Sequence, residues 1–147
     1  MPKPFRFSLE RVLDYRIQLE ERARLNLARA QQAYQAQADI VVRLRKDLAR
    51  HEQAMSEEPE KTPEKLWLMR RFKRRLELDI RRGEERLLEL AKMLNAARRE
   101  AVAASRERKL LEKLKEKQAK RHVQEEQFEE QKEYDEMATI RYQAQDI

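Results

Sequence analysis

The fold of this chain is decided by a short polar break between two long stretches that lack proline, Ser56-Glu57-Glu58-Pro59-Glu60-Lys61-Thr62-Pro63-Glu64. Its last three residues are of the types favoured at the N-cap, the first position and the first turn of an α-helix. No proline follows the break, and the chain has one glycine. We therefore predict helices at about residues 9–55 and 63–140, with Ser8 as the N-cap of the first, joined by a loop at about residues 56–62.

An apolar heptad stripe runs along both predicted helices. Alternating steps of four and three residues meet ten apolar residues of fourteen from Leu9 to Met55, and ten of thirteen from Met69 to Leu111. This spacing is typical of a coiled-coil seam. If the chain folds back antiparallel about residue 60, Leu9 lies opposite Glu112. The second stripe then ends where its partner helix ends, so two features of the sequence agree on one register.

These features predict an all-α fold in which residues 1–147 form a single two-helix antiparallel coiled-coil hairpin. The long second helix overhangs at its C-terminal end, so that residues 112–147 project beyond the first helix. The composition agrees, because Ala, Glu, Lys, Arg and Leu make up more than half of the chain. Charged residues account for 42% of the chain but the net charge is only +6, and the scarcity of turn residues excludes β-rich and α/β folds.

Catalysis has no support in the sequence. A two-helix hairpin offers no concave site, and the only histidines, His51 and His122, are interpreted as solvated surface residues without metal partners. There is no cysteine for thiolate or zinc chemistry, and one glycine cannot build a phosphate-binding loop. We predict a non-enzymatic protein with no catalytic residue, no cofactor and no metal site. No apolar run approaches the ~20 residues of a spanning helix, so we expect a cytoplasmic protein.

Three surface features each allow a functional and a plainer interpretation. Five cations between Arg70 and Arg75 could bind phosphate or simply form a solvated helix face. Trp67 and Phe72 cannot both lie on the seam, and they indicate either a partner interface or a local cap over the loop. Residues 106–121 are basic and residues 125–136 are acidic, which is typical of a helix that awaits a partner or of a frayed, solvated tail.

Both ends of the chain resemble the FliJ family of flagellar export proteins. The opening pattern is Phe5-x-Phe7-x-Leu9-x-x-Val12-Leu13-x-x-Arg16 with Glu20 or Glu21 and Ala23, and the closing pattern is Gln131-Lys132-Glu133-Tyr134-Asp135-Glu136-Met137-Ala138 with Arg141. Tyr134 and Met137 stand where the family usually has leucine. The length and the two-helix layout match over the whole chain.

The resemblance implies a component of the flagellar type III export apparatus similar to the central stalk of rotary ATPases. Its terminal end would enter the hexameric export ATPase and promote assembly and hydrolysis. It would also contact the cytoplasmic domain of the export-gate membrane protein and escort export chaperones. The protein would thus be associated peripherally with the inner membrane at the flagellar base. On this interpretation the ATPase end holds Phe5, Phe7, Tyr134, Asp135, Glu136 and Arg141. Our candidates for the gate contact are Trp67, Phe72 and Leu76.

Two other classes stay open. One is a coiled coil that binds nucleic acid or another acidic surface through Arg70–Arg75 and residues 106–121, although the acidic tail and the near-balanced charge disfavour it, so we expect no nucleic-acid partner. The other is a structural coiled coil that self-associates, whereas the stalk interpretation predicts a monomer when free. The sequence does not separate the flagellar apparatus from related virulence secretion systems.

Overall fold

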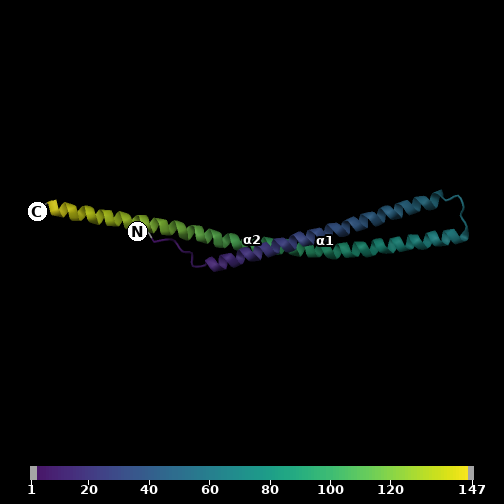
Figure 1. The fold of residues 1–147 in the computed structure, drawn as a ribbon, viewed down its shortest axis with the longest axis horizontal. Coiled ribbons are helices and arrows are strands. Elements are labelled where there is room, and N and C mark those ends of the chain that lie inside the picture. Colours follow the sequence, from purple (N-terminus) through teal and green to yellow (C-terminus); the bar gives the residue numbers. More distant parts are fainter. Residues whose placement is uncertain (1–2, 146–147) are drawn as a thin grey trace. The chain divides into compact units, whose positions relative to one another are not determined.

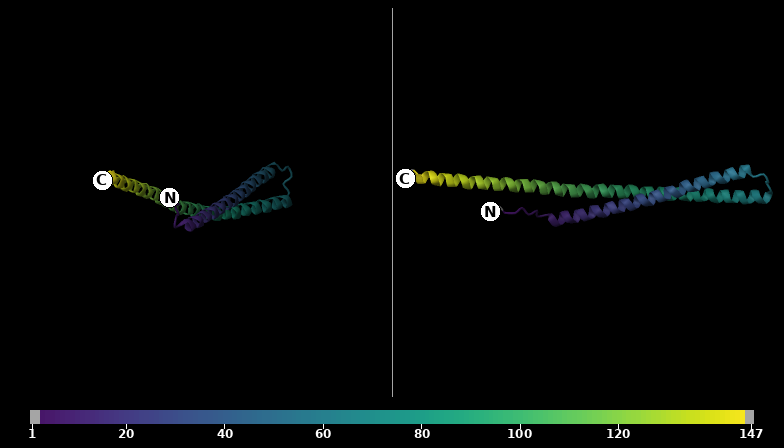
Figure 2. Two further views of the ribbon diagram at one scale, coloured as in Figure 1. Left: turned by 60° about the vertical axis from the view of Figure 1, so that its left-hand side comes forward. Right: turned by 45° about the horizontal axis from the view of Figure 1, so that its top comes forward.

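The computed structural model describes residues 3–145 and contains two helices, α1 (Glu10–Glu57) and α2 (Pro63–Gln145), joined by one short loop (Figure 1). No strand occurs within the described range. Two further views show the same pair of helices and the non-helical segment that precedes α1 (Figure 2). The predicted all-α helical hairpin with a longer second helix is therefore confirmed.

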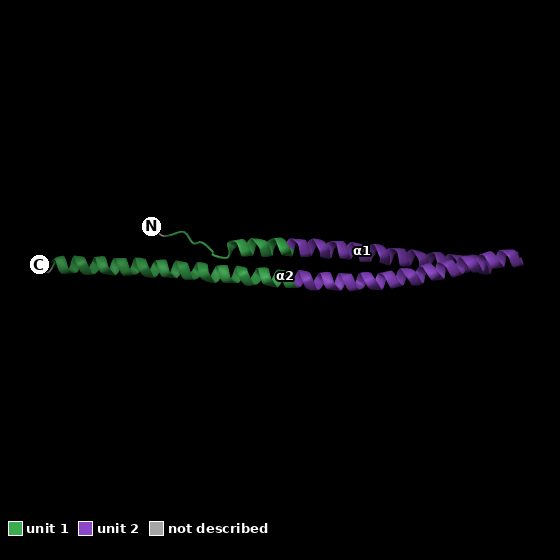
Figure 3. Cartoon of the chain, turned by 90° about the horizontal axis from the view of Figure 1, so that it is seen from below, with its two compact units in different colours: residues 1–20, 103–147 green, residues 21–102 purple. Residues whose placement is uncertain are grey.

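The chain divides into two compact units (Figure 3). Unit 1 combines Met1–Glu20 with Ala103–Ile147, and unit 2 is Glu21–Val102. Within each unit a stretch of α1 runs antiparallel to a stretch of α2, and charged pairs join the two stretches. The pairs are Arg16–Glu107, Glu20–Arg108 and Glu10–Lys115 in unit 1, and Arg45–Glu84 and Glu52–Lys73 in unit 2.

The start of α2 follows the predicted capping pattern. The backbone N–H of Lys65 donates to the Thr62 hydroxyl oxygen at 3.3 Å, and the N–H of Leu66 donates to the Thr62 carbonyl at 3.0 Å. Thr62 is thus the N-cap and Pro63 takes the first helical position, where its missing N–H costs nothing. At the start of α1, the N–H of Glu10 donates to the Phe7 carbonyl at 3.2 Å.

Burial is confined to one stripe on each helix. Of the fourteen heptad positions predicted for the first helix, all except Leu9 are buried or half-buried, and the same holds for all thirteen positions from Met69 to Leu111. Leu9 precedes α1, which begins at Glu10, and it is 36% exposed. The buried apolar side chains are Phe7, Leu13, Ala23, Val41, Leu76, Leu90, Leu94 and Ala97.

A part-buried ion pair interrupts the apolar seam of unit 1. Glu20 is only 3% exposed, and its carboxylate accepts a hydrogen bond from the Nε of Arg108. Arg108 also donates through Nη1 to Glu112 at 2.7 Å. These hydrogen bonds, to Glu20 first and then to Glu112, raise the pKa of Arg108 above its ordinary value, so the guanidinium stays charged and compensates the buried carboxylate.

Gly83, the single glycine of the chain, has a packing role in the seam. It is buried in the seam of unit 2, and a Cβ placed there would lie 3.1 Å from Cγ2 of Val41 and 3.5 Å from Nε2 of Gln37. The Gln37 side-chain amide donates to the Gly83 carbonyl at 3.1 Å. A side chain at position 83 would therefore push α1 away and break this hydrogen bond.

We expect Gly83→Leu to destabilise the protein by about 1–3 kcal/mol, because a β-branched valine cannot rotate cheaply out of the way. Thermal unfolding followed by circular dichroism at 222 nm measures the effect. Ala36→Leu is the matched control, since Ala36 lies exposed on α1 of the same unit. Equal melting temperatures for the two variants would show that the close approach at Gly83 does not matter for stability.

Candidate functional site

Two sets of residues are candidates for partner binding. The terminal surface consists of Phe5, Phe7, Tyr134, Asp135, Glu136 and Arg141, all of which belong to unit 1. The loop surface consists of Trp67, Phe72 and Leu76, all of which belong to unit 2.

The N-terminal segment of the terminal surface lies against α2 at His122. The Nε2 atom of His122 is 2.8 Å from the Lys3 carbonyl oxygen and 3.0 Å from the Glu126 carboxylate. Since both partners are acceptors, this nitrogen carries the proton that is donated. The ring of Phe5 lies 5.7 Å from the His122 ring. His122 therefore anchors the segment, and our interpretation of it as a solvated surface residue is corrected.

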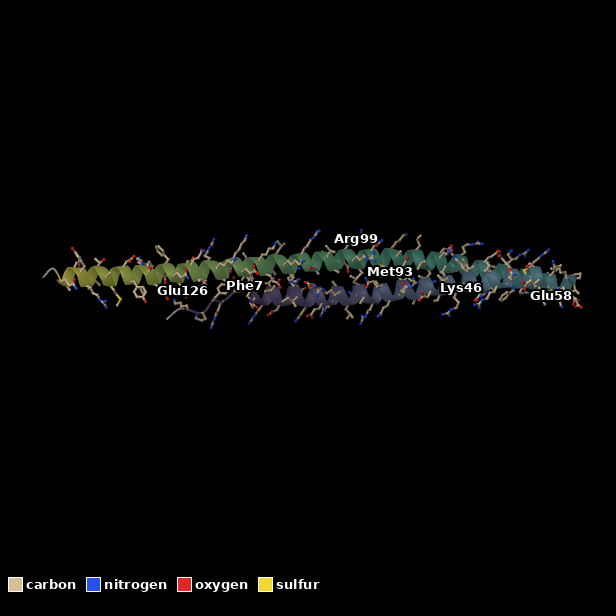
Figure 4. The ribbon with its side chains drawn as sticks, turned by 90° about the horizontal axis from the view of Figure 1, so that it is seen from above. Phe7, Lys46, Glu58, Met93, Arg99 and Glu126 are labelled. Carbon is tan, nitrogen blue, oxygen red and sulfur yellow. The ribbon has the colours of Figure 1, made fainter. Side chains whose placement is uncertain are left out.

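Phe7 is held more firmly than its neighbour Phe5. It is only 7% exposed, whereas Val12 in the first turn of α1 is 41% exposed. Figure 4 shows Phe7 just before α1 and Glu126 on the stretch of α2 that the N-terminal segment accompanies. Phe7 thus ties the non-helical segment to unit 1, so a partner could contact it only after the segment moves.

The C-terminal residues of the terminal surface are accessible. Every residue from Gln127 to Gln145 is exposed. Tyr134 and Arg141 border one shallow hollow on the surface of α2, while Asp135 and Glu136 are not among its lining residues. The Asp135 carboxylate instead accepts a hydrogen bond from Gln131 at 3.2 Å, within the same helix.

Sequence reasoning missed several exposed apolar side chains in this region. They are Phe128, Met137, Ile140 and Tyr142, each more than half exposed. Met137 and Tyr142 line the same hollow as Tyr134 and Arg141. A period of three and four residues links Tyr134, Met137, Arg141 and Gln145, and this helical spacing was the signal that could have identified a binding stripe.

The three residues of the loop surface differ in how exposed their side chains are. Trp67 is 58% exposed, and the guanidinium of Arg71 lies over its ring at 5.2 Å from the centroid. Phe72 is 52% exposed and packs edge-on against His51, with ring centroids 4.7 Å apart. Leu76 is only 6% exposed and belongs to the seam. A partner at this surface would reach Trp67 and Phe72 directly, but not Leu76.

His51 also makes two contacts with α2, which we did not expect of a solvated residue. Its Nε2 atom lies 2.7 Å from the Met69 carbonyl oxygen, which fixes the ring against α2 and beneath Phe72. In the part of the chain that the structure describes, no group of three or more acidic, histidine or cysteine side chains could hold a metal ion. Over the same range, neither helix has a stretch apolar enough to cross a membrane.

We expect Phe7→Ala to loosen unit 1 locally. Losing a buried phenylalanine costs more than about 1.4 kcal/mol, so amide hydrogen exchange at residues 10–20 and 108–122 should rise by about tenfold or more. Exchange at residues 21–102 should change little. Val12→Ala is the control, because it removes a nearby apolar side chain that is largely exposed. If both variants exchange like the unaltered protein, Phe7 does not tie down the segment.

Comparison with known families gives one result that covers nearly the whole chain. A family model described as "FliJ: Flagellar FliJ protein" matches residues 5–146. Comparison with curated proteins and with solved structures finds no match. The matched range includes every residue of the terminal surface and of the loop surface.

Proposed function

The chain belongs to the flagellar FliJ family, whose members are components of the flagellar protein export apparatus, and we propose that it acts there as a non-enzymatic stalk. On this proposal the C-terminal part of α2 enters the hexameric export ATPase and promotes its assembly and hydrolysis. The protein also links the ATPase to the cytoplasmic domain of the export gate and to export chaperones. It works at the cytoplasmic face of the inner membrane and is a monomer when free.

The observation that carries the proposal is the exposed C-terminal stretch of α2. Residues 127–145 belong to one continuous helix, and every one of them is exposed. Tyr134, Met137, Ile140 and Tyr142 are 57–68% exposed there. Such a helix is marginal in isolation, and side chains of this size are anchors at interfaces. A ring lumen would cover the helix on all sides, which suits exposed apolar groups that point in several directions.

The buried Glu20–Arg108 pair supports the monomer. Parallel self-pairing of two open chains would place Glu20 opposite Glu20 instead of Arg108, and an unpaired buried carboxylate is costly. A structural coiled coil that self-associates would instead sediment as a stable dimer at micromolar concentration.

We expect the protein to stimulate ATP hydrolysis by the purified cognate export ATPase, and the double variant Tyr134→Ala/Arg141→Ala to lose most of that stimulation. Neither side chain makes a hydrogen bond or ion pair among the described residues, so the fold should be unaffected. The rate is measured with increasing amounts of each protein while hexamer formation is followed by sedimentation.

Leu110→Ala is the control for this experiment, because Leu110 is an exposed apolar residue of α2 outside the terminal surface. A variant that lacks residues 125–147 gives the upper limit of the loss. If the full chain, shown to be helical by circular dichroism, changes neither the rate nor the assembly of the ATPase, the stalk role is excluded.

For the gate contact, we expect Phe72→Ala to weaken binding to the cytoplasmic domain of the gate protein by about tenfold, the size of effect for an interface anchor. Isothermal titration measures the affinity. Leu88→Ala is the control, since Leu88 is 63% exposed on α2 of the same unit. Leu76→Ala is less informative, because it also opens a cavity in the seam. Unchanged affinity of the Phe72 variant removes this residue from the gate contact.

A further inference from the structure

The outward side of α2 just after the loop carries a dense group of arginines around the only tryptophan. We define the arginine face as Trp67, Arg70, Arg71, Arg74, Arg81 and Arg82, all of which are exposed. Residues three, four, seven, eleven and fourteen apart share one side of a helix. The seam residues Met69, Leu76 and Gly83 repeat every seven residues on the other side.

Most arginines of this face form no ion pair within the described part of the protein. Arg70, Arg74, Arg81 and Arg82 make no ion pair with any residue from 3 to 145. Residues 67–82 contain seven cations against two acids. Of those acids, Asp79 pairs with Arg75 at 3.4 Å. Glu77 is exposed three residues after Arg74 and four before Arg81, so it offsets part of their charge without an ion pair. This short stretch therefore carries almost the whole net charge of the chain.

The indole of Trp67 lies at the end of the face nearest the loop. The Arg71 guanidinium covers its ring at 5.2 Å, yet Trp67 remains 58% exposed and Leu68 beside it is 60% exposed. Phe72 lies about 140° around the helix from Trp67 and packs on His51 instead. Trp67 is thus free to contact a surface that lies against the arginines, independently of Phe72.

We propose that the arginine face binds the surface of an anionic lipid bilayer, with the guanidinium groups on lipid phosphates and Trp67 with Leu68 inserted at the headgroup boundary. Arginine matches phosphate in a bidentate manner, and tryptophan beside cations is typical of interfacial helices. From Trp67 to Arg82 the helix extends about 22 Å, so a flat surface can contact the whole face. The phosphates of duplex nucleic acid could pair with the guanidinium groups, but Leu68 and Trp67 would then stay in water.

This inference goes beyond the proposed function, because it needs neither the ATPase nor the gate protein. It gives a reason why the end of the molecule that holds the loop could stay at a membrane without a spanning helix. Each arginine near an anionic surface contributes about a fivefold gain in binding. Four unpaired arginines together would therefore make binding strongly dependent on lipid charge and on salt.

The test uses the fluorescence of the full-length protein, which has a single tryptophan. Vesicles of phosphatidylcholine with about one third phosphatidylglycerol should shift the emission of Trp67 to the blue and protect it from quenching by iodide, whereas vesicles of phosphatidylcholine alone should do neither. Raising the salt concentration should reverse the shift. Unchanged emission with the anionic vesicles, or an equal shift with the neutral ones, would overturn the proposal.

A matched pair of variants separates this face from general charge. Replacing Arg70, Arg74, Arg81 and Arg82 with glutamine should weaken co-sedimentation with anionic vesicles by at least about a hundredfold. The control replaces Arg98, Arg99, Arg106 and Lys109 with glutamine, which removes the same charge from other exposed positions without ion pairs. An equal loss in the two variants would mean that net charge alone is responsible, and would overturn the assignment.

Two further measurements distinguish other occupants. Binding to duplex DNA that is tighter than binding to vesicles at equal phosphate concentration would identify a nucleic-acid face and overturn the lipid assignment. Phe72→Ala should bind vesicles normally even if it loses the gate domain. The arginine variant should keep its stimulation of the export ATPase. Failure of the stalk role and failure of the lipid role are therefore separate outcomes.

Discussion

The pairing of α1 and α2 depends on a seam that is too narrow to be specified by apolar burial alone. Not one described side chain is fully enclosed, and the most buried apolar residues, Leu13 and Val41, keep 4% of their surface exposed. If the register of α1 against α2 shifted by one heptad, apolar residues would still face apolar residues at many positions. Such a shift would, however, bring Leu13 or Leu27 to the place of Glu20 and deprive Arg108 of its buried partner. The ion pair therefore selects the register, and the apolar stripe supplies most of the favourable free energy.

Because the seam takes only one stripe from each helix, most of the surface is left for partners. Small residues let the two helices approach closely in unit 2, where Gly83 lies against Val41 and Gln37. The large apolar side chains that the seam does not use are exposed, and in a protein of this kind they are better explained by binding than by stability. Trp67 and Tyr134 illustrate this, since neither contributes to the seam.

Sequence reasoning predicts the helices, the loop and the stripe because these follow from local rules. Thr62 and Pro63 act on the next few backbone groups, and the heptad period needs only the geometry of a helix. It does not predict the contacts of the N-terminal segment, because no period relates Phe7 or Lys3 to His122. Likewise, the partners of His51 depend on which carbonyl of α2 the register brings near it. The close approach at Gly83 needs both helices in place, so the sequence shows only the cost of a glycine and not its use.

The net charge of the chain is a poor guide to its surfaces, because charges of opposite sign are segregated along α2. The balanced total disfavoured an anionic partner when the sequence was considered as a whole. In the structure, Arg70, Arg74, Arg81 and Arg82 lie together without ion pairs among the described residues, while residues 125–136 hold seven acids against one lysine. At physiological salt, charges more than about 8 Å apart are largely screened from each other. Acids close in sequence, such as Glu77 and Glu85, offset part of the arginine charge. The local sequence, rather than the total charge of the chain, therefore sets the charge that each surface offers a partner.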